Sequence, residues 1–395
     1  SAGWRISEEQ FMKDLVPQMD NLKLRASWGS IGNDSQLNAS QFVSGWQFED
    51  RFILGGAGNS SASITNGMKE ANLANPNITW YKVMTTNVGL DGSFWGGKLS
   101  FEFDYFYRKT TGYPATRNTS LPTTSGIPLP QENLNSSDNR GFELSLGTVQ
   151  RIGNVNLQIK GNVAYAREKD LYKEQALPLN QYKNWRDNGA YRWKNVTWGY
   201  EHIGQFQSYD EIYNSPIQDG KGNSSLRPGD IKYKDLNGDG LIDANDEKVI
   251  GKGTFPDLNF GLTLAADWKG FDVNILFQGA SNYTQVLNAL TSPFRGPGEG
   301  NGFRVWMDSW HKADYNDPDS EWVPGKFPSL RIEGNDNNSK KSTYWTTDAY
   351  YVRLKSIEIG YTIPKNLLSK VGIEHLRVYA NAYNPLTITN VKYTD

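Results

Sequence analysis

Segments in which apolar and polar residues alternate recur along the whole chain. In the clearest of them, residues 98–109, every second position from Leu99 to Tyr107 is leucine, phenylalanine or tyrosine, and most of the positions between are polar. Residues 154–167 show the same pattern. A period of two predicts β-strands that have one apolar face and one polar face.

Similar segments bring the predicted total, with the opening residues, to about ten strands. The further segments are 21–28, 86–95, 141–148, 259–268, 271–279, 356–363 and 376–383. The predicted fold class is therefore all-β and antiparallel.

The predicted connections alternate between short and long. Gly96-Gly97, Gly153-Asn154 and Lys269-Gly270 are tight hairpin signals, and residues 364–374 form a slightly longer link. Between these hairpins lie four long segments, rich in glycine, proline, asparagine and tryptophan. They are residues 31–79, 110–139, 169–257 and 282–348. Loops of that size are uncommon in a compact soluble domain, whereas a transmembrane β-barrel combines short periplasmic turns with long extracellular loops.

Two architectures fit these strands, because alternation does not say what covers the apolar face. A sandwich buries that face against a second sheet, and a transmembrane barrel turns it toward lipid. The runs of about 10 to 14 residues suit a tilted bilayer crossing. Aromatic residues such as Trp95, Tyr105, Trp268 and Tyr361 stand near strand ends, as in interfacial girdles. The pattern favours the barrel, and the sandwich remains the alternative.

Composition excludes several classes of protein. The 395 residues contain no cysteine, which excludes disulfide scaffolds, cysteine-ligated zinc sites and thiol enzymes. A formal net charge of -2 argues against binding of nucleic acid through a basic face. Mean hydropathy is -0.64, yet the chain has 13 Trp, 21 Tyr and 17 Phe. Alternating strands reconcile these numbers, because only every second residue of a strand must be apolar.

A loop of acidic and amide residues from Asp235 to Glu247 predicts a cation site. Its spacing matches a twelve-position calcium loop, with oxygen ligands at alternate positions and Gly240 at the sharp turn. The predicted ligands are Asp235, Asn237, Asp239, Leu241 through its carbonyl, Asp243 and Asp246. The flanks do not read as paired helices, so a structural Ca²⁺ is expected rather than a sensor, with Mg²⁺ as a second choice. An Asx-rich turn without metal is the alternative.

No constellation typical of an enzyme is found. His202, His311 and His375 are far apart and lack the spacing of a metal-binding or catalytic motif. The nucleophile-elbow, P-loop and dinucleotide-binding motifs are absent from the sequence. The chain is therefore not expected to be an enzyme.

Contact with a ligand or a partner protein is expected in the tryptophan-rich loops, because flat aromatic faces stack on sugars and fill interfaces. The candidates are Trp185, Trp193, Trp198, Trp306, Trp310, Trp322 and Trp345. The alternative is that these loops use tryptophan to build small cores of their own. Polar strand residues, such as Glu102, Asp104, Arg108, Gln158 and Lys160, could line a solute path or simply be hydrated.

Six collinear motifs, together with one longer segment, resemble those of SusC/RagA-like TonB-dependent transporters of Bacteroidetes outer membranes. The segment runs from Arg227-Pro-Gly-Asp-Ile-Lys-Tyr through the acidic loop to Phe255-Pro-Asp-Leu-Asn-Phe-Gly-Leu262. The other motifs begin at Ser1, Leu24, Tyr105, Asn139, Tyr351 and Ile359. They keep their order over nearly the whole chain, so together they are far more specific than any one alone.

The resemblance implies a barrel of 22 strands in the bacterial outer membrane, of which this chain supplies about ten. It also implies TonB-dependent import of oligomeric nutrients, oligosaccharides first and peptides second, together with a SusD-like surface lipoprotein as a lid. Residues 1–395 would then be a C-terminal portion of the barrel. The plug domain, the TonB-contacting segment and the final strand, which would follow Asp395, are not found in this sequence. The alternative function is that of a secreted, calcium-stabilised carbohydrate-binding β-protein.

Overall fold

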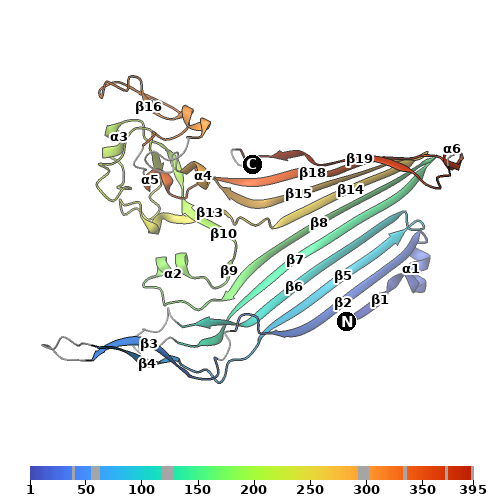
Figure 1. The fold of residues 1–395 in the computed structure, drawn as a ribbon, viewed down its shortest axis with the longest axis horizontal. Helices are drawn as coiled ribbons and strands as arrows, with labels where there is room; N and C mark the ends of the chain where they lie inside the picture. Colours follow the sequence, from blue (N-terminus) through green and yellow to red (C-terminus); the bar gives the residue numbers. More distant parts are fainter. Residues whose placement is uncertain are drawn as a thin grey trace. The chain divides into compact units, whose positions relative to one another are not determined.

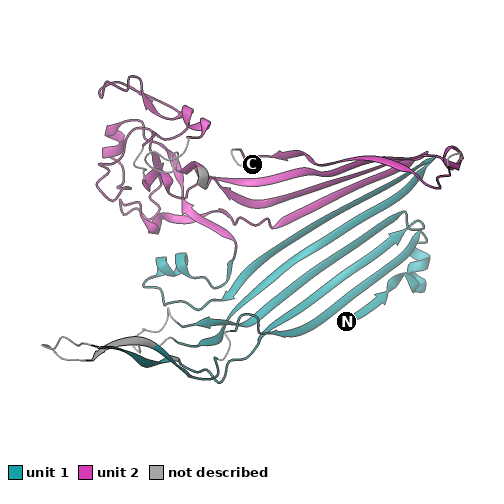
Figure 2. Ribbon diagram, viewed as in Figure 1, with its two compact units in different colours: residues 1–194 teal, residues 195–395 magenta. Residues whose placement is uncertain are grey.

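The computed structural model describes residues 1–37, 41–54, 63–117, 129–291, 302–331, 336–369 and 372–392. The chain divides into two compact units, residues 1–194 and residues 195–395 (Figure 2). Residues 393–395, at the predicted break before the last strand, lie outside the described part. The two units are considered separately below.

Unit 1 is built on long antiparallel strands that follow one another along the sheet in the order β1-β2-β5-β6-β7-β8 (Figure 1). Their bounds are Ala2–Arg5, Met19–Asn33, Tyr81–Phe94, Leu99–Thr116, Gln131–Ile152 and Val155–Tyr172. The short β9 (Arg192–Trp193) pairs with β8. Gly96, Gly97 and Gly153 have positive φ in the predicted hairpin turns, a conformation that costs glycine no steric strain.

The connections of unit 1 contain elements of their own. The hairpin β3–β4 (Gly45–Leu54 and Ser63–Asn72) interrupts the predicted loop of residues 31–79. The described part of the unit also has three short helices, η1 (Ile6–Glu8), α1 (Gln10–Leu15) and α2 (Gln181–Asp187). Asn180 caps α2 by accepting a hydrogen bond from the Lys183 amide.

Unit 2 also has a meander of long antiparallel strands, β14-β15-β18-β19. They span Leu258–Trp268, Phe271–Val286, Thr346–Thr362 and Arg377–Thr389. Lys269 and Gly270, both with positive φ, form the two-residue turn between β14 and β15. The helix α6 (Lys365–Leu368) lies in the link between β18 and β19.

Outside this meander, the described residues of unit 2 include a loop core of small paired elements. The strand pairs are β10–β13 (Val196–Tyr200 and Glu247–Lys252), β11–β12 (His202–Gln205 and Ile231–Tyr233) and β16–β17 (His311–Lys312 and Trp322–Val323). The helices are α3 (Tyr209–Tyr213), η2 (Ala244–Asp246), α4 (Asn288–Thr291), η3 (Arg304–Asp308) and α5 (Asp336–Ser339). Tyr200, Ile231, Tyr233, Ile242, Leu290, Trp306, Phe327 and Trp345 pack into one buried cluster.

The sheet of unit 1 has two chemically different faces. Cross-strand pairing places Phe103, Leu144 and Val163 side by side on β6, β7 and β8. Several side chains of this apolar face are exposed, for example Trp28 at 64% and Leu146 at 48%, and Leu144 and Val163 are half-buried. Because no second layer covers this face in the described part of unit 1, its apolar side chains match a lipid-facing surface and not the inside of a sandwich.

The strands are longer than the alternation predicts, and the loops are correspondingly shorter. Strand β7 begins at Gln131 and β6 ends at Thr116, inside the predicted loop of residues 110–139. Backbone pairing continues there although residues 131–139 are almost entirely polar. When both faces of a strand are in water, apolar alternation is not required, so the pattern disappears before the strand ends. Among the described residues, no helix is long and apolar enough to span a membrane.

Candidate functional site: the polar sheet face and the loop cavity

The polar face of the unit 1 sheet carries an ion cluster around Arg25 of β2. Its guanidinium donates to both carboxylate oxygens of Asp91 at 2.7 Å and to Asp104 at 2.9 Å. The carboxylate of Glu102 is 3.5 Å away. A bidentate arginine–carboxylate pair fixes the geometry of both side chains, so three neighbouring strands are held together while the carboxylates stay on the water-accessible face.

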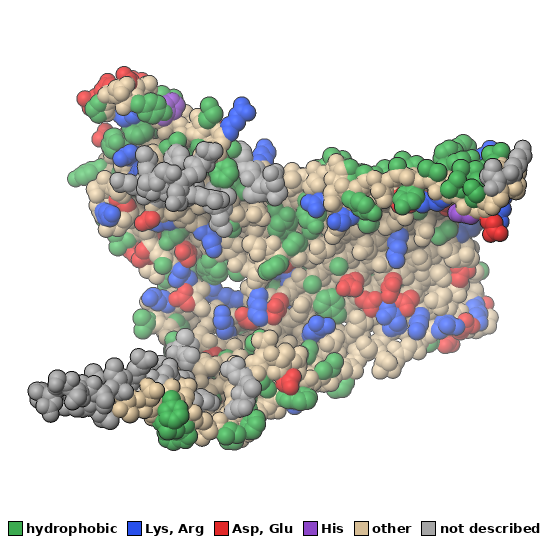
Figure 3. All heavy atoms as spheres, in the orientation of Figure 1, with side chains coloured by type: hydrophobic (Ala, Val, Ile, Leu, Met, Phe, Trp, Pro, Cys, Tyr) green, Lys and Arg blue, Asp and Glu red, His purple; other side chains and the backbone are tan. Residues whose placement is uncertain are grey.

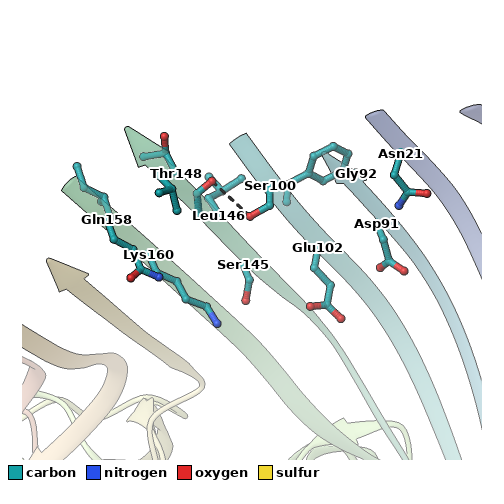
Figure 4. A pocket seen from close by; sticks show the side chains of 14 residues that line it. Asn21, Asp91, Gly92, Ser100, Glu102, Ser145, Leu146, Thr148, Gln158 and Lys160 are labelled. Carbon is teal, nitrogen blue, oxygen red and sulfur yellow. Dashed lines mark hydrogen bonds between the residues drawn. The ribbon is translucent and has the colours of Figure 1, made fainter. Parts of the chain in front are cut away.

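A hollow of about 450 Å³ lies on the same face, nearer the short turns. Figure 4 shows that Asp91, Glu102, Ser145 and Lys160 come from four neighbouring strands and point to the same side. Charged side chains of both signs also gather over the strands of unit 1 in Figure 3. The hollow therefore offers hydrogen-bond acceptors and a cation to a polar solute, and it contains Glu102, Gln158 and Lys160 of the predicted solute path.

A second hollow, of about 520 Å³, lies toward the long-loop end of the unit 1 sheet. Arg108, Glu168, Asp170 and Lys194 line it. The Lys194 ammonium is 2.7 Å from Glu168 and 3.2 Å from Asp170. Of the five predicted path residues, Arg108 belongs to this hollow, and Asp104 belongs to the Arg25 cluster.

Unit 2 has its own ion cluster on strands. Arg377 of β19 donates through Nε to Asp272 of β15 at 3.0 Å and through Nη2 to Glu358 of β18 at 2.6 Å. Asp272 stands directly opposite Gly360, the glycine two residues after Glu358. Gly360 leaves room for the arginine, because a Cβ at this position would clash with Arg377 Nη2.

The loop core of unit 2 contains the largest of these cavities, at about 1050 Å³. Its charged lining residues are Asp219, Lys221, Arg227, Arg331, Asp336 and Lys340. Burial opposes ionisation of Asp219, but hydrogen bonds from the amides of Ser225, Lys221 and Asn223 and from the Ser225 hydroxyl outweigh it. Its pKa is lowered to about 2. Burial lowers the pKa of Lys340, whose ammonium donates to the Gln218 carbonyl at 2.6 Å.

The segment that opens the family motif builds one wall of this cavity. Asp230 is fully buried and accepts hydrogen bonds from the Arg227 amide at 2.8 Å and from the Asn338 side-chain amide at 2.8 Å. The guanidinium of Arg331 also donates to it. The sequence did not reveal these partners, because Arg331 and Asn338 are 101 and 108 residues away from Asp230.

The acidic loop is closed by its own backbone. The Asp235 carboxylate accepts from the amides of Gly238 at 2.7 Å and Gly240 at 2.9 Å. Asp246, fully buried, accepts from the amides of Leu236 and Asp243. The side chains of Asn237, Asp239 and Asp243 each accept from an amide two residues further on.

These oxygens are the ligand type that Ca²⁺ prefers, and an ionised carboxylate that accepts one hydrogen bond keeps further lone pairs. However, the described residues contain no group of three or more acidic or histidine side chains arranged to hold a metal. The loop therefore keeps its shape through Asx-type hydrogen bonds in this structure, and calcium binding by Asp235 to Asp246 stays a prediction.

The seven tryptophans predicted to make contacts differ in exposure and fall into three groups. Trp306, Trp310 and Trp345 are 5%, 4% and 1% exposed in the loop core, where they build that core, as the alternative interpretation expected. Trp185 is 56% exposed and packs on Tyr182. Trp193, Trp198 and Trp322 are half-buried, and Trp193 and Trp322 lie against cationic side chains.

Two of the three histidines pack against tyrosines. His202 meets Tyr344 edge-on at 5.2 Å between ring centroids, and His311 stacks on Tyr315 at 6.1 Å. Burial lowers the pKa of His202. His375 lies in the link that precedes β19.

Comparisons with known proteins show what the chain is similar to. It is 28% identical over 402 aligned residues to the TonB-dependent receptor P3 of Formosa agariphila, an alignment that covers 99% of this chain and 37% of that protein. It is 24% identical to the TonB-dependent receptor SusC of Bacteroides thetaiotaomicron, covering all of this chain and 37% of that receptor. No protein-family model matches.

Among solved structures, the RagAB peptide transporter matches with a TM-score of 0.68 at 20% identity, over 98% of this chain and 39% of that chain. The chain thus spans less than two fifths of the length of these relatives. The match confirms the predicted transporter-barrel fold. The sequence and fold matches together confirm the resemblance to SusC/RagA-like transporters and the location in the bacterial outer membrane. The similar proteins carry the names of receptors and transporters, not of enzymes.

Proposed function

For this chain, which is SusC/RagA-like in sequence and fold, we propose a role as part of the wall of a TonB-dependent importer of oligomeric nutrients. The observation that carries the proposal is the pair of unlike sheet faces in unit 1. One face presents exposed apolar side chains, such as Trp28 and Leu146, and the other holds the Arg25 cluster and two hollows. A wall between lipid and a water-filled lumen requires that arrangement.

The proposed cargo is an oligosaccharide, with a peptide as the second choice. The hollows and the loop cavity of unit 2 combine carboxylates, cations and amides, which hydrogen-bond to hydroxyl or peptide groups alike. A SusD-like surface lipoprotein is the proposed partner at the loops, and the TonB complex is the proposed source of energy. Of the seven tryptophans, Trp185 is best placed to contact either ligand or partner, because its ring is exposed.

Two strands support the proposal that further strands complete the barrel. Among the described strands β1 pairs only with β2, and β19 pairs only with β18. Twelve of the thirteen residues of β19 are exposed. An unpaired strand edge is not tolerated in the hydrocarbon region. We therefore propose that additional strands of the same transporter pair with β1 and β19. The masses of the membrane-extracted protein and of any polypeptides that co-purify with it would test this proposal.

Uptake measurements test the proposed function. Cells that carry the transporter should accumulate a labelled oligosaccharide or oligopeptide only when TonB is present and energised. A double variant, Glu102→Gln/Lys160→Gln, should lower uptake because both charges line the hollow of Figure 4. The control, Glu143→Gln, leaves the lining of the hollow unchanged and should leave uptake unchanged. Equal uptake without TonB would reject the proposal.

The alternative function, a secreted carbohydrate-binding protein, makes a different prediction. A secreted protein would stay monomeric without detergent or lipid. We expect aggregation instead, because the apolar face of unit 1 is far larger than the single exposed residues normal for soluble proteins.

A further inference from the structure

The apolar face of the unit 1 sheet ends in two rows of mainly cationic and aromatic residues. Strands β6, β7, β8 and β9 pair in sequence (Figure 1), so residues on one face can be read off as rows across the sheet. The row Tyr105–Phe142–Tyr165 is wholly aromatic, and the rings of Phe142 and Tyr165 stack at 5.8 Å. It marks the upper part of the apolar band.

The next two rows, toward the long-loop end, change character abruptly. The first contains Tyr107, Arg140 and Arg167, and the second contains Lys109, Asp138, Lys169 and Trp193. We call these seven residues the cationic rows. They hold four positive charges and one negative charge, and they lie on the same face of the sheet as the apolar band.

The cationic rows are built as one packed surface. The ring of Trp193 lies under the Arg167 guanidinium at 4.3 Å and beside Arg140 at 5.6 Å and Lys169 at 5.8 Å. Cation–π packing of this kind orders long side chains without neutralising their charge. The single carboxylate of the rows, Asp138, is 1% exposed. It accepts hydrogen bonds from the Arg140 guanidinium at 2.6 Å and from the Tyr107 hydroxyl. The net charge presented outward is consequently positive.

The opposite face of the same strands, at the same distance along them, carries charges of both signs. Arg108 faces that side with Glu168 and Asp170, and Lys194 bridges the two carboxylates. The concentration of cations is therefore a property of the outward face and not of the strand ends in general.

We propose that the cationic rows bind the phosphate-bearing headgroup of a glycolipid in the outer leaflet of the outer membrane. The inference rests on the membrane location and on the charge complementarity of the rows. Long loops lie on the extracellular side of such barrels, so the rows stand where outer-leaflet headgroups begin. The aromatic row below contacts acyl chains and the sugar edge, while arginine and lysine bind phosphate oxygens.

Native mass spectrometry of the membrane-extracted protein tests this proposal. The probes are a diphosphorylated diglucosamine lipid and its dephosphorylated form. The protein should retain the phosphorylated lipid preferentially, and the double variant Arg167→Gln/Lys169→Gln should retain on the order of tenfold less of it. This variant leaves the ion pair between Arg140 and the buried Asp138 intact. The exchanged variant Arg167→Lys/Lys169→Arg, which keeps both charges, should restore retention.

The matched control is Arg108→Gln/Lys160→Gln, which removes two charges from the opposite face of the same sheet and should leave lipid retention unchanged. Equal retention of the two lipids, or equal loss in the control, overturns the proposal. The proposal is also overturned if the Arg167→Gln/Lys169→Gln variant retains as much phosphorylated lipid as the parent but loses a co-purifying protein. Import of the nutrient is measured separately, so failure here does not count against the proposed transport function.

Discussion

The sheet of unit 1 and the loop core of unit 2 treat apolar side chains in opposite ways. In the loop core, Trp345, Tyr233 and Phe206 are fully buried, as in a water-soluble protein. In the described part of the unit 1 sheet, Tyr81, at 7% exposed, is the one large apolar side chain among the buried residues, and Trp28 and Val88 stay exposed. The difference follows from the surroundings of the two regions, which are water for the loop core and lipid for the apolar face of the sheet. Water drives the loops to enclose a core, whereas lipid removes that drive and leaves the sheet to be held by backbone pairing and by ion clusters on its wet face.

The largest effect is expected from truncation in the loop core. Trp345→Ala removes a 1% exposed ring and its hydrogen bond to the Asn338 carbonyl at 2.6 Å, and it should destabilise the loop region by about 3 to 5 kcal/mol. Hydrogen exchange of loop amides would measure the loss. Trp185→Ala, at an exposed ring, is the control and should change protection little. Equal loss in both variants would mean that the loops have no core.

A charge on the lipid-facing side of the sheet should cost somewhat less. Leu144→Arg places a cation in the middle of the apolar band and should destabilise the lipid-folded protein by about 2 to 4 kcal/mol. Ser145→Arg, one residue further on, points into the hollow of Figure 4 and should be tolerated. Folding titrations in vesicles measure the stability of both variants. If Ser145→Arg were the more destabilised of the two, the assignment of the lipid-facing and lumen-facing sides would be wrong.

Binding of calcium to the acidic loop would stabilise the loop core and not the sheet. At a concentration 100 times the dissociation constant, the gain is about 2.7 kcal/mol. Thermal unfolding with Ca²⁺ and with a chelator, in the parent and in Asp239→Ala, separates this prediction from the Asx-turn alternative. Without metal binding, Ca²⁺ leaves the melting temperature of both proteins unchanged.

Asp219 gives the loop core a pH dependence of smaller size. Its pKa of about 2 lies below the value of an unfolded aspartate, about 3.9. The ionised form is therefore favoured by folding. The resulting stability is present above about pH 4 and is lost as the pH falls toward 2. Asp219→Asn should lower loop stability by about 1 to 2 kcal/mol at neutral pH, and the difference from the parent should disappear near pH 2. A constant difference across this range would contradict the assignment.

The two regions also differ in how far the sequence predicts them. The alternation from Leu99 to Tyr107 predicts the strand at residues 98–109, because lipid on one side and water on the other impose a period of two. The pattern does not predict the extension of this strand to Thr116, because water on both sides imposes no period. The transporter resemblance indicates the fold, but it does not show how the motif is used, in which the Asn338 side chain donates a hydrogen bond to Asp230.

Alternation along one strand does not predict which side chains meet across the sheet. The Arg25 cluster joins residues up to 79 positions apart, and the cationic rows exist only once β6, β7 and β8 are placed in register. Local periodicity shows which face a residue takes, but register between strands decides which residues meet on that face. Lys109 and Lys169, for example, share a row through Asp138.

The most direct test of the central claim is a spin-label scan along β6. The sequence contains no cysteine, so single cysteines at each position from Leu99 to Tyr107 label this chain uniquely. In lipid, labels at the odd positions should be relaxed mainly by oxygen, and labels at Ser100, Glu102 and Asp104 mainly by a water-soluble nickel reagent. The account predicts this alternation. Labels equally accessible to the water-soluble reagent at odd and even positions, or shielded from it at the even ones, would contradict it.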